Sequence, residues 1–299
     1  MIPKYIMLKE KITEDIIKNK YPIGSKLPTE MELSMMYHVS RSTVRQALAL
    51  LAEQEIIKKH WGSGNMIASK PDNNKTSTVM VLLLNNKTEE NKTLLGDINS
   101  VIKKNNLDIE FHETSNSYQR ERDFLKLILQ DIYAGLIIYM VNSNLPSTNS
   151  DIMQLLLKRQ TPIVFINAAP MDLYNPTVVS LDNYNKGYLI ARKLINNGQM
   201  EIGATFMNND AASAKIFSGF IDAIRDANLP ILDKRFIWRN YSQTINNNSS
   251  QLPATDLIPS KSLGKECAKA LLTIKKNGSC KSITIPFKTI YERNLGVVS

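Results

Sequence analysis

The chain has 299 residues, of which 43% are hydrophobic, so it is long and apolar enough for two domains with packed cores. Lysine and arginine exceed aspartate and glutamate by nine, an excess that attracts phosphate or anionic lipid, and no stretch reaches the roughly 18 apolar residues of a membrane-spanning helix. Two cysteines without CxxC spacing, three scattered histidines and the absence of common enzyme motifs lead us to expect a cytoplasmic protein that is not an enzyme and holds no metal or cofactor.

The N-terminal part has the pattern of three short helices followed by a hairpin. Leu8, Ile12 and Ile16 recur every four residues and predict a first helix of about four turns. Thr29 and Glu32 form a T-x-x-E capping box, which predicts the start of a second helix. On this second helix, the apolar repeat consists of Leu33, Met36 and Tyr37.

A third helix is predicted after Ser40, which can cap it. Its apolar residues recur at helical spacing and predict a buried stripe: Val44, Ala47, Leu48 and Leu51. Its opposite face is polar and cationic: Arg41, Ser42, Arg45 and Gln46.

Two short strands near residues 56–60 and 65–68 are predicted next, joined by a turn at residues 62–64. Three helices and a hairpin in this order describe a small α+β winged helix-turn-helix domain over residues 1–70. Residues 71–78 are polar and turn-forming, and predict a linker.

Residues 79–299 have a different pattern, in which short apolar runs alternate with amphipathic helices. The runs VMVLLL, IEF, GLIIYM, PIVFI and IGATFM predict strands. The helical candidates lie between them, at residues 121–130, 152–160, 185–197 and 211–227. This alternation favours an α/β domain built from βαβ units with parallel sheets.

The polar face of the third predicted helix has the residue types that read DNA. An arginine can meet two acceptors of guanine in the major groove and a glutamine can do the same for adenine, so Arg45 and Gln46 are candidate base contacts. Ser42 and Thr43, at the start of the helix, can donate to phosphate oxygens. The alternative for Arg41 and Arg45 is a solvated helix face with i, i+4 spacing.

A second polar cluster surrounds the turn of the predicted hairpin, which we call the wing. Its members could contact the DNA backbone or minor groove, and its glycines would let the two backbones approach closely. The alternative is an ordinary hairpin turn that uses glycine for its positive φ. The candidate residues are Lys58, Lys59, His60, Trp61, Gly62 and Gly64.

The N-terminal part resembles the GntR-type winged helix through PKYIMLKEKI, IGSKLPTEMEL, VSRSTVRQAL and the glycine-containing wing. This resemblance covers nearly all of residues 1–70. It implies that Lys4, Arg41, Arg45 and Trp61 contact DNA, although Trp61 stands where a glutamine would be expected.

The rest of the chain resembles the effector domain of lactose-repressor-like regulators, a two-lobed, periplasmic-binding-protein-like fold. QRERDFLKLIL, TPIVFINA, LDNYNKGYLIARKLINNG and SGFIDAIRDANLP carry this resemblance. Head and body together are similar to arabinose-responsive repressors of Gram-positive bacteria. The resemblance implies a homodimer that binds operator DNA and is released by a sugar, L-arabinose being the candidate.

Ligands of such α/β clefts bind at the carboxyl ends of strands. Asn85, Asn167 and Asn208 each follow an apolar run and are candidate partners of sugar hydroxyls; the alternative for Asn167 is a turn asparagine. Asp182 fits a helix N-cap better than a ligand. Ile216 occupies the place where the resemblance implies a sugar-holding arginine, and its neighbour Lys215 is the candidate substitute.

The second lobe is expected to be shortened. Between FIWRNY and SKSLGKECAKALL the sequence lacks about two βα units, at about 30 residues each, that the resemblance implies. Two alternatives therefore stay open beside a sugar-responsive repressor: a DNA-binding regulator whose effector domain is too reduced to sense sugar, and a sugar-binding protein or enzyme whose basic head is only an interaction module.

Overall fold

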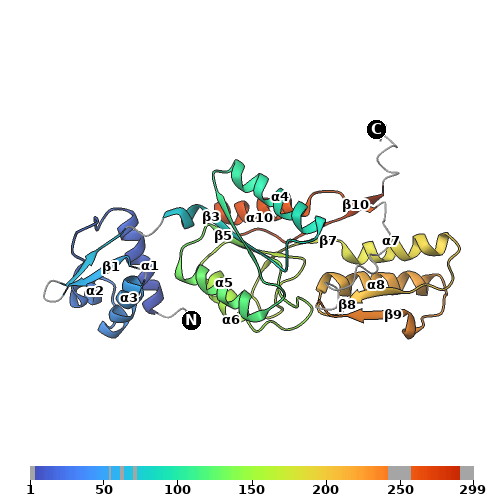
Figure 1. Cartoon of the computed structure of the whole chain (residues 1–299), viewed down its shortest axis with the longest axis horizontal. Coiled ribbons are helices and arrows are strands. Elements are labelled where there is room, and N and C mark those ends of the chain that lie inside the picture. Colours follow the sequence, from blue (N-terminus) through green and yellow to red (C-terminus); the bar gives the residue numbers. More distant parts are fainter. Residues whose placement is uncertain (1–3, 54, 61–63, 70–72, 242–256, 290–299) are drawn as a thin grey trace. The chain divides into compact units, whose positions relative to one another are not determined.

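The computed structural model describes residues 4–53, 55–60, 64–69, 73–241 and 257–289 (Figure 1). Contacts divide the chain into two compact units, Met1–Thr76 and Ser77–Ser299. A 3-10 helix, η1 (Asn73–Ser77), fills most of the predicted linker. Strand β3 begins at Thr78, which removes the last residue from that linker. Over the described ranges, no helix is both long and apolar enough to span a membrane.

The N-terminal unit is the predicted winged helix-turn-helix domain. Its elements are α1 (Lys4–Ile17), α2 (Glu30–Met36), α3 (Arg41–Glu53), β1 (Ile57–His60) and β2 (Gly64–Ile67). The apolar residues predicted from helical spacing form its core, since Leu8, Ile12 and Ile16 of α1 and the stripe of α3 are all buried. Burial of these faces holds together helices too short to be stable alone.

Helix α2 begins with the predicted capping box. The Thr29 amide donates to Glu32 Oε2 at 2.7 Å, and the Glu32 amide donates to Thr29 Oγ1 at 3.3 Å. The predicted apolar face of α2 is only partly correct, because Leu33 is buried whereas Met36 is 48% exposed. In this helix of seven residues Leu33 is the buried side chain, and Met36 is the last residue of the helix.

The wing strands β1 and β2 pair antiparallel, with His60 opposite Gly64. The segment before α2 adds further hydrogen bonds to β2: the Leu27 amide donates to the Asn65 carbonyl and the Ile67 amide to the Ser25 carbonyl, each at 2.9 Å. The wing is therefore tied to the body of its domain along β2.

The second unit contains a six-stranded parallel sheet, as the alternating pattern predicts. The strand order is β11-β7-β6-β5-β3-β4. The strands are β3 (Thr78–Leu83), β4 (Asp108–Glu113), β5 (Gly135–Ile138), β6 (Ile163–Ile166), β7 (Thr177–Leu181) and β11 (Ile283–Ile285). All neighbouring pairs are parallel, so the carboxyl ends of the strands share one edge.

Helices cover both faces of this sheet, and together they form the first lobe (Figure 1). Alternate residues of β3 point to opposite cores: Val79 and Val81 pack with α4 (Glu89–Lys104) and α10 (Leu263–Asn277). Met80 and Leu82 pack with α5 (Tyr118–Gln130) and α6 (Ser150–Lys158). Burial on both faces explains why β3 is a continuous apolar run.

The second lobe is a smaller βαβ unit. Its strands β8 (Ala204–Met207) and β9 (Phe236–Arg239) are parallel and pair only with each other among the described residues. Helices α7 (Asn183–Asn196) and α8 (Ala211–Asp226) pack closely, and η2 (Asp233–Arg235) precedes β9. Asp182 accepts a hydrogen bond from the Asn185 amide at 3.1 Å, so the predicted N-cap is confirmed. A further antiparallel pair joins β10 (Leu257–Pro259) and β12 (Phe287–Thr289).

Candidate nucleic-acid interface and ligand pocket

Helix α3 separates its apolar and polar residues as predicted. Val44, Ala47 and Leu48 are buried, and the polar residues Arg41, Ser42, Arg45 and Gln46 are all exposed. The buried stripe fixes the helix on its domain, so the exposed face has a defined orientation. The major groove of B-DNA is wide enough to admit one such helix.

The first turn of α3 carries a cluster of hydroxyl groups. Ser40 Oγ accepts a hydrogen bond from the Thr43 amide at 3.2 Å, which confirms Ser40 as the cap. The hydroxyls of Ser42 and Thr43 each lie 2.8 Å from Ser40 Oγ. These groups and the positive end of the helix dipole are suited to a phosphate oxygen.

Both arginines of the polar face contact α2. Arg45 Nε donates to Glu30 Oε2 at 2.7 Å. The guanidinium of Arg41 donates instead to the thioether sulfur of Met31. The sequence pattern does not indicate either contact, because it depends on how α2 and α3 cross.

The other predicted DNA contacts lie on α1 and in the hairpin. Lys4 is exposed on the first residue of α1, and Lys58 and Lys59 are exposed on β1. The backbone of His60 ends β1, and Gly64 begins β2 with φ +90°. Trp61 and Gly62 lie outside the described residues.

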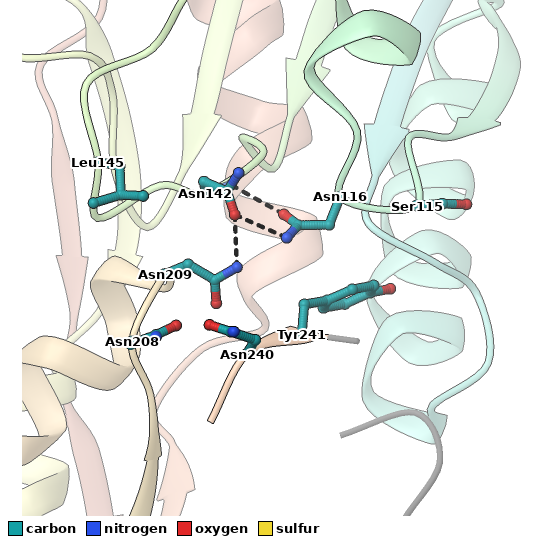
Figure 2. Close-up of a pocket in the computed structure, with 8 residues that line it drawn as sticks. All are labelled: Ser115, Asn116, Asn142, Leu145, Asn208, Asn209, Asn240 and Tyr241. Carbon is teal, nitrogen blue, oxygen red and sulfur yellow. Dashed lines mark hydrogen bonds between the residues drawn. The ribbon is translucent and has the colours of Figure 1, made fainter. Parts of the chain in front are cut away.

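The second unit contains a pocket of about 580 Å³, which is within the size range of small-molecule sites (Figure 2). Its walls are the segments that follow the carboxyl ends of β4, β5, β8 and β9, where ligands of parallel sheets bind. The lining residues are Ser115, Asn116, Asn142, Leu145, Asn208, Asn209, Asn240 and Tyr241.

A chain of side-chain amides crosses the pocket from the first lobe to the second (Figure 2). Asn116 Nδ2 donates to Asn142 Oδ1 at 2.9 Å, and Asn209 Nδ2 donates to the same oxygen at 2.6 Å. Asn116 and Asn142 both have positive φ, which asparagine tolerates better than most residues. Asn209 Oδ1 is buried and accepts no hydrogen bond from the described residues, so it can accept one from a ligand hydroxyl.

One of the four predicted effector residues lines this pocket. Asn208 follows β8 directly and is a lining residue. Asn85, Asn167 and Lys215 are not lining residues. Lys215 is exposed on α8, and Ile216 is half-buried in the apolar core of the second lobe.

Asn85 bonds a lining residue of the pocket, whereas Asn167 belongs to a buried turn that follows β6. Asn85 Nδ2 donates to the hydroxyl of Tyr241 at 2.5 Å, and that hydroxyl donates to the Leu84 carbonyl at 3.3 Å. Asn167 is 8% exposed, has φ +64° and accepts from the Leu181 amide at 3.4 Å. Its left-handed backbone and burial fit the alternative of a turn asparagine.

Beside the pocket, Asp210 joins the two lobes. Its Oδ1 accepts from the Tyr139 hydroxyl at 2.7 Å and from the Ser143 hydroxyl at 3.3 Å. Its Oδ2 caps α8 by accepting from the Ser213 amide at 2.9 Å. Burial, together with the Asp210 carboxylate, holds the pKa of Tyr139 well above its ordinary value, so this hydroxyl keeps its proton.

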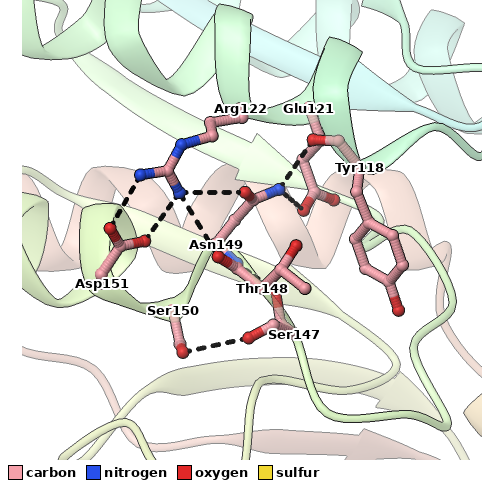
Figure 3. A network of polar contacts seen from close by, with 8 residues as sticks. All are labelled: Tyr118, Glu121, Arg122, Ser147, Thr148, Asn149, Ser150 and Asp151. Carbon is pink, nitrogen blue, oxygen red and sulfur yellow. Dashed lines mark hydrogen bonds and ion pairs between the residues drawn. The ribbon is translucent and has the colours of Figure 1, made fainter.

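A polar network fixes the loop that carries Asn142 (Figure 3). Glu121 of α5 is fully buried and accepts from the Val141 amide at 2.8 Å and from Asn149 Nδ2 at 2.9 Å. Burial raises the pKa of Glu121, although both hydrogen bonds oppose this shift. Arg122 donates through two nitrogens to Asp151, each at 2.9 Å, which ties α5 to the start of α6.

The sequence analysis missed most of the pocket residues, although they obey the rule that ligands of parallel sheets bind at the carboxyl ends of strands. Asn142, Asn209 and Asn240 all follow strands, as Asn208 does. The three predicted asparagines follow β3, β6 and β8, whereas most of the pocket is lined by the segments after β4, β5 and β9. Which of these segments meet in space depends on the strand order, which the sequence does not show.

These features define the class of fold: a winged helix-turn-helix domain followed by a periplasmic-binding-protein-like α/β domain. Residues 4–67 match the family model described as bacterial regulatory proteins, gntR family. The chain is similar to the crystal structure of a periplasmic binding protein/LacI transcriptional regulator from Alkaliphilus metalliredigens complexed with D-xylulofuranose. The TM-score is 0.56 at 15% identity, over 72% of this chain and 97% of that one. The architecture expected from the sequence is therefore confirmed.

Two relatives extend the similarity over both units. The chain is 26% identical to the arabinose metabolism transcriptional repressor of Halalkalibacterium halodurans over 243 residues, covering 79% of this chain. It is also 26% identical to the protein of the same name from Geobacillus stearothermophilus over 232 residues, covering 77% of this chain. The matches span 64% of the length of each relative, less than two thirds.

Proposed function

We propose that the chain is a sequence-specific DNA-binding transcriptional repressor of sugar-utilisation genes. The observation that carries this proposal is the exposed Arg41, Ser42, Arg45 and Gln46 face of α3, presented by a complete winged helix-turn-helix core. In this proposal α3 enters the major groove, Arg45 and Gln46 contact bases, and Ser42 and Thr43 contact phosphate.

The wing and the start of α1 supply further backbone contacts in this proposal. Lys4, Lys58 and Lys59 are exposed cations that can each neutralise a phosphate. Two copies of the chain, paired as a homodimer, would place two α3 helices in successive major grooves of a pseudo-palindromic operator. The relatives, both arabinose metabolism repressors, support this assignment.

The effector is proposed to be a small sugar, with L-arabinose as the candidate, bound in the Asn-rich pocket. Amide groups supply both donors and acceptors, and the unpaired Asn209 Oδ1 needs a donor such as a hydroxyl. A sugar that bonds Asn142 and Asn209 bridges the two lobes and can shift the population toward a conformation with low operator affinity.

A second candidate is a regulator that binds DNA without responding to sugar. The two-stranded sheet of the described second lobe favours it, because this lobe supplies part of the pocket wall. Calorimetry with L-arabinose and other pentoses, run beside operator gel shifts, separates the two candidates. Heat of binding and loss of the shifted band support the sugar-responsive repressor, whereas a shifted band that no pentose changes supports the second candidate.

A further inference from the structure

The contact between Arg45 and α2 uses a particular part of the guanidinium. Glu30 Oε2 accepts from Nε of Arg45 at 2.7 Å. The two terminal nitrogens, which form the fork that meets N7 and O6 of guanine, are not used in this contact. Glu30 therefore holds the Arg45 side chain through Nε and leaves the two terminal nitrogens available to a base.

The two arginines of the polar face are held differently. Arg45 is paired with a carboxylate, the stronger kind of hydrogen-bond acceptor. The hydrogen bond of Arg41 within the described part of the chain is to the sulfur of Met31, a weak acceptor that imposes little orientation. This difference indicates a fixed orientation for Arg45 and an adaptable one for Arg41.

The Arg45–Glu30 pair contributes little to the stability of the domain. The Arg45 side chain is 68% exposed and that of Glu30 is 34% exposed, and ion pairs this accessible to water are worth little in folding. A carboxylate beside a DNA-binding face also repels phosphate. A role in DNA recognition therefore explains the Arg45–Glu30 pair better than a role in the stability of the domain.

We propose that Glu30 is a positioning residue for base recognition: it orients the Arg45 guanidinium toward guanine and keeps it from pairing with phosphate instead. The inference rests on the proposed function, because it requires that α3 reads DNA. Glu30 thus increases discrimination between the operator and random DNA while lowering affinity for both.

Two substitutions separate hydrogen bonding from charge. Glu30→Ala removes both, so we expect the ratio of operator affinity to random-DNA affinity to fall about tenfold, within the range of one bidentate base contact. Affinity for random DNA should rise, and its salt dependence should steepen because the freed Arg45 gains a phosphate. Glu30→Gln keeps an acceptor for Nε and should restore most of the discrimination.

Glu53→Ala is the matched control, since it removes one carboxylate from the exposed surface at the far end of α3. It should leave the affinity ratio unchanged. The inference is wrong if Glu30→Ala keeps the wild-type ratio, or if Glu53→Ala lowers it equally. If the wild-type chain itself shows no preference for any sequence selected from random DNA, the proposed function fails first.

Discussion

Under the proposed function, Arg45 is the residue expected to contribute most to sequence discrimination. It lies in the second turn of α3 with its side chain exposed, and Glu30 leaves its terminal nitrogens available. Lys4 differs in kind, because a single ammonium on the first residue of α1 is a point charge without a planar fork. The two residues therefore lead to separable predictions.

Arg45→Ala should lower the preference for operator over random DNA by about 1–3 kcal/mol, the value of one bidentate base contact. Titration of both DNAs by fluorescence anisotropy measures the difference. A mutant with wild-type preference would show that Arg45 makes no base contact.

Lys4→Ala should weaken binding to every sequence alike and reduce the slope of log affinity against log salt by about 0.9, the contribution of one phosphate. The measurement is the same titration repeated over a series of salt concentrations. Lys104→Ala, at the end of α4 in the second unit, removes the same charge and should leave the slope unaltered. Equal slopes for wild type and Lys4→Ala would remove Lys4 from the interface.

The close packing of α7 against α8 depends on two glycines. A Cβ on Gly219 would lie 1.9 Å from the Tyr184 carbonyl oxygen, and one on Gly187 would lie 1.9 Å from that of Ile216. The two helices thus meet backbone to backbone, and no side chain fits between them.

Gly219→Ala should therefore destabilise the second lobe by about 1–3 kcal/mol, as other overpacking substitutions do. Urea unfolding followed through the fluorescence of Trp238, in a Trp61→Phe background, measures the change. Gly96→Ala in α4 is the control, because its Cβ would meet nothing within 4 Å and should be neutral or stabilising by about 0.5–1 kcal/mol. Equal effects of the two substitutions would contradict the backbone contact.

The sequence predicts the elements where periodicity is long enough. The stripes of α1 and α3, the capping box of α2 and the apolar runs of β3, β5 and β6 all gave the correct element. Strands β10, β11 and β12 have three residues each, too few for an alternating pattern. The pocket was predicted only in part, since Asn208 lines it and Asn85 bonds the lining residue Tyr241, whereas Asn167 bonds the Leu181 amide instead.

In the whole molecule, the two lobes of the second unit are joined beside the pocket, and the proposed effector would act through this junction. Tyr139 and Ser143 of the first lobe meet Asp210, which also caps α8 in the second. The Ala211 amide donates to Ser143 Oγ at 3.0 Å, which reinforces the same junction. A ligand in the adjacent pocket would act on Asn142 and Asn209, direct neighbours of these groups in the chain.

Tyr139→Phe should destabilise the second unit by about 1–3 kcal/mol, because a partly buried carboxylate loses its closest hydroxyl donor. Tyr184→Phe is a chemical match on the surface: its hydroxyl donates to Asp222 at 2.8 Å, but Tyr184 is 44% exposed. Water can replace that donor, so the cost should stay below about 0.5 kcal/mol. Thermal unfolding measures the loss of stability in each variant. Equal losses would show that the Tyr139–Asp210 hydrogen bond does not stabilise the junction between the lobes.

Selection by the whole protein from a library of random duplexes tests most directly whether the chain binds a specific DNA sequence. We expect enrichment of pseudo-palindromic sites whose half-sites lie about one helical turn, or a multiple of it, apart. The guanine positions of those sites should lose their enrichment when Arg45→Ala is used. Selected pools with no enrichment over the starting library, at a salt concentration where the protein still binds DNA, would contradict the claim.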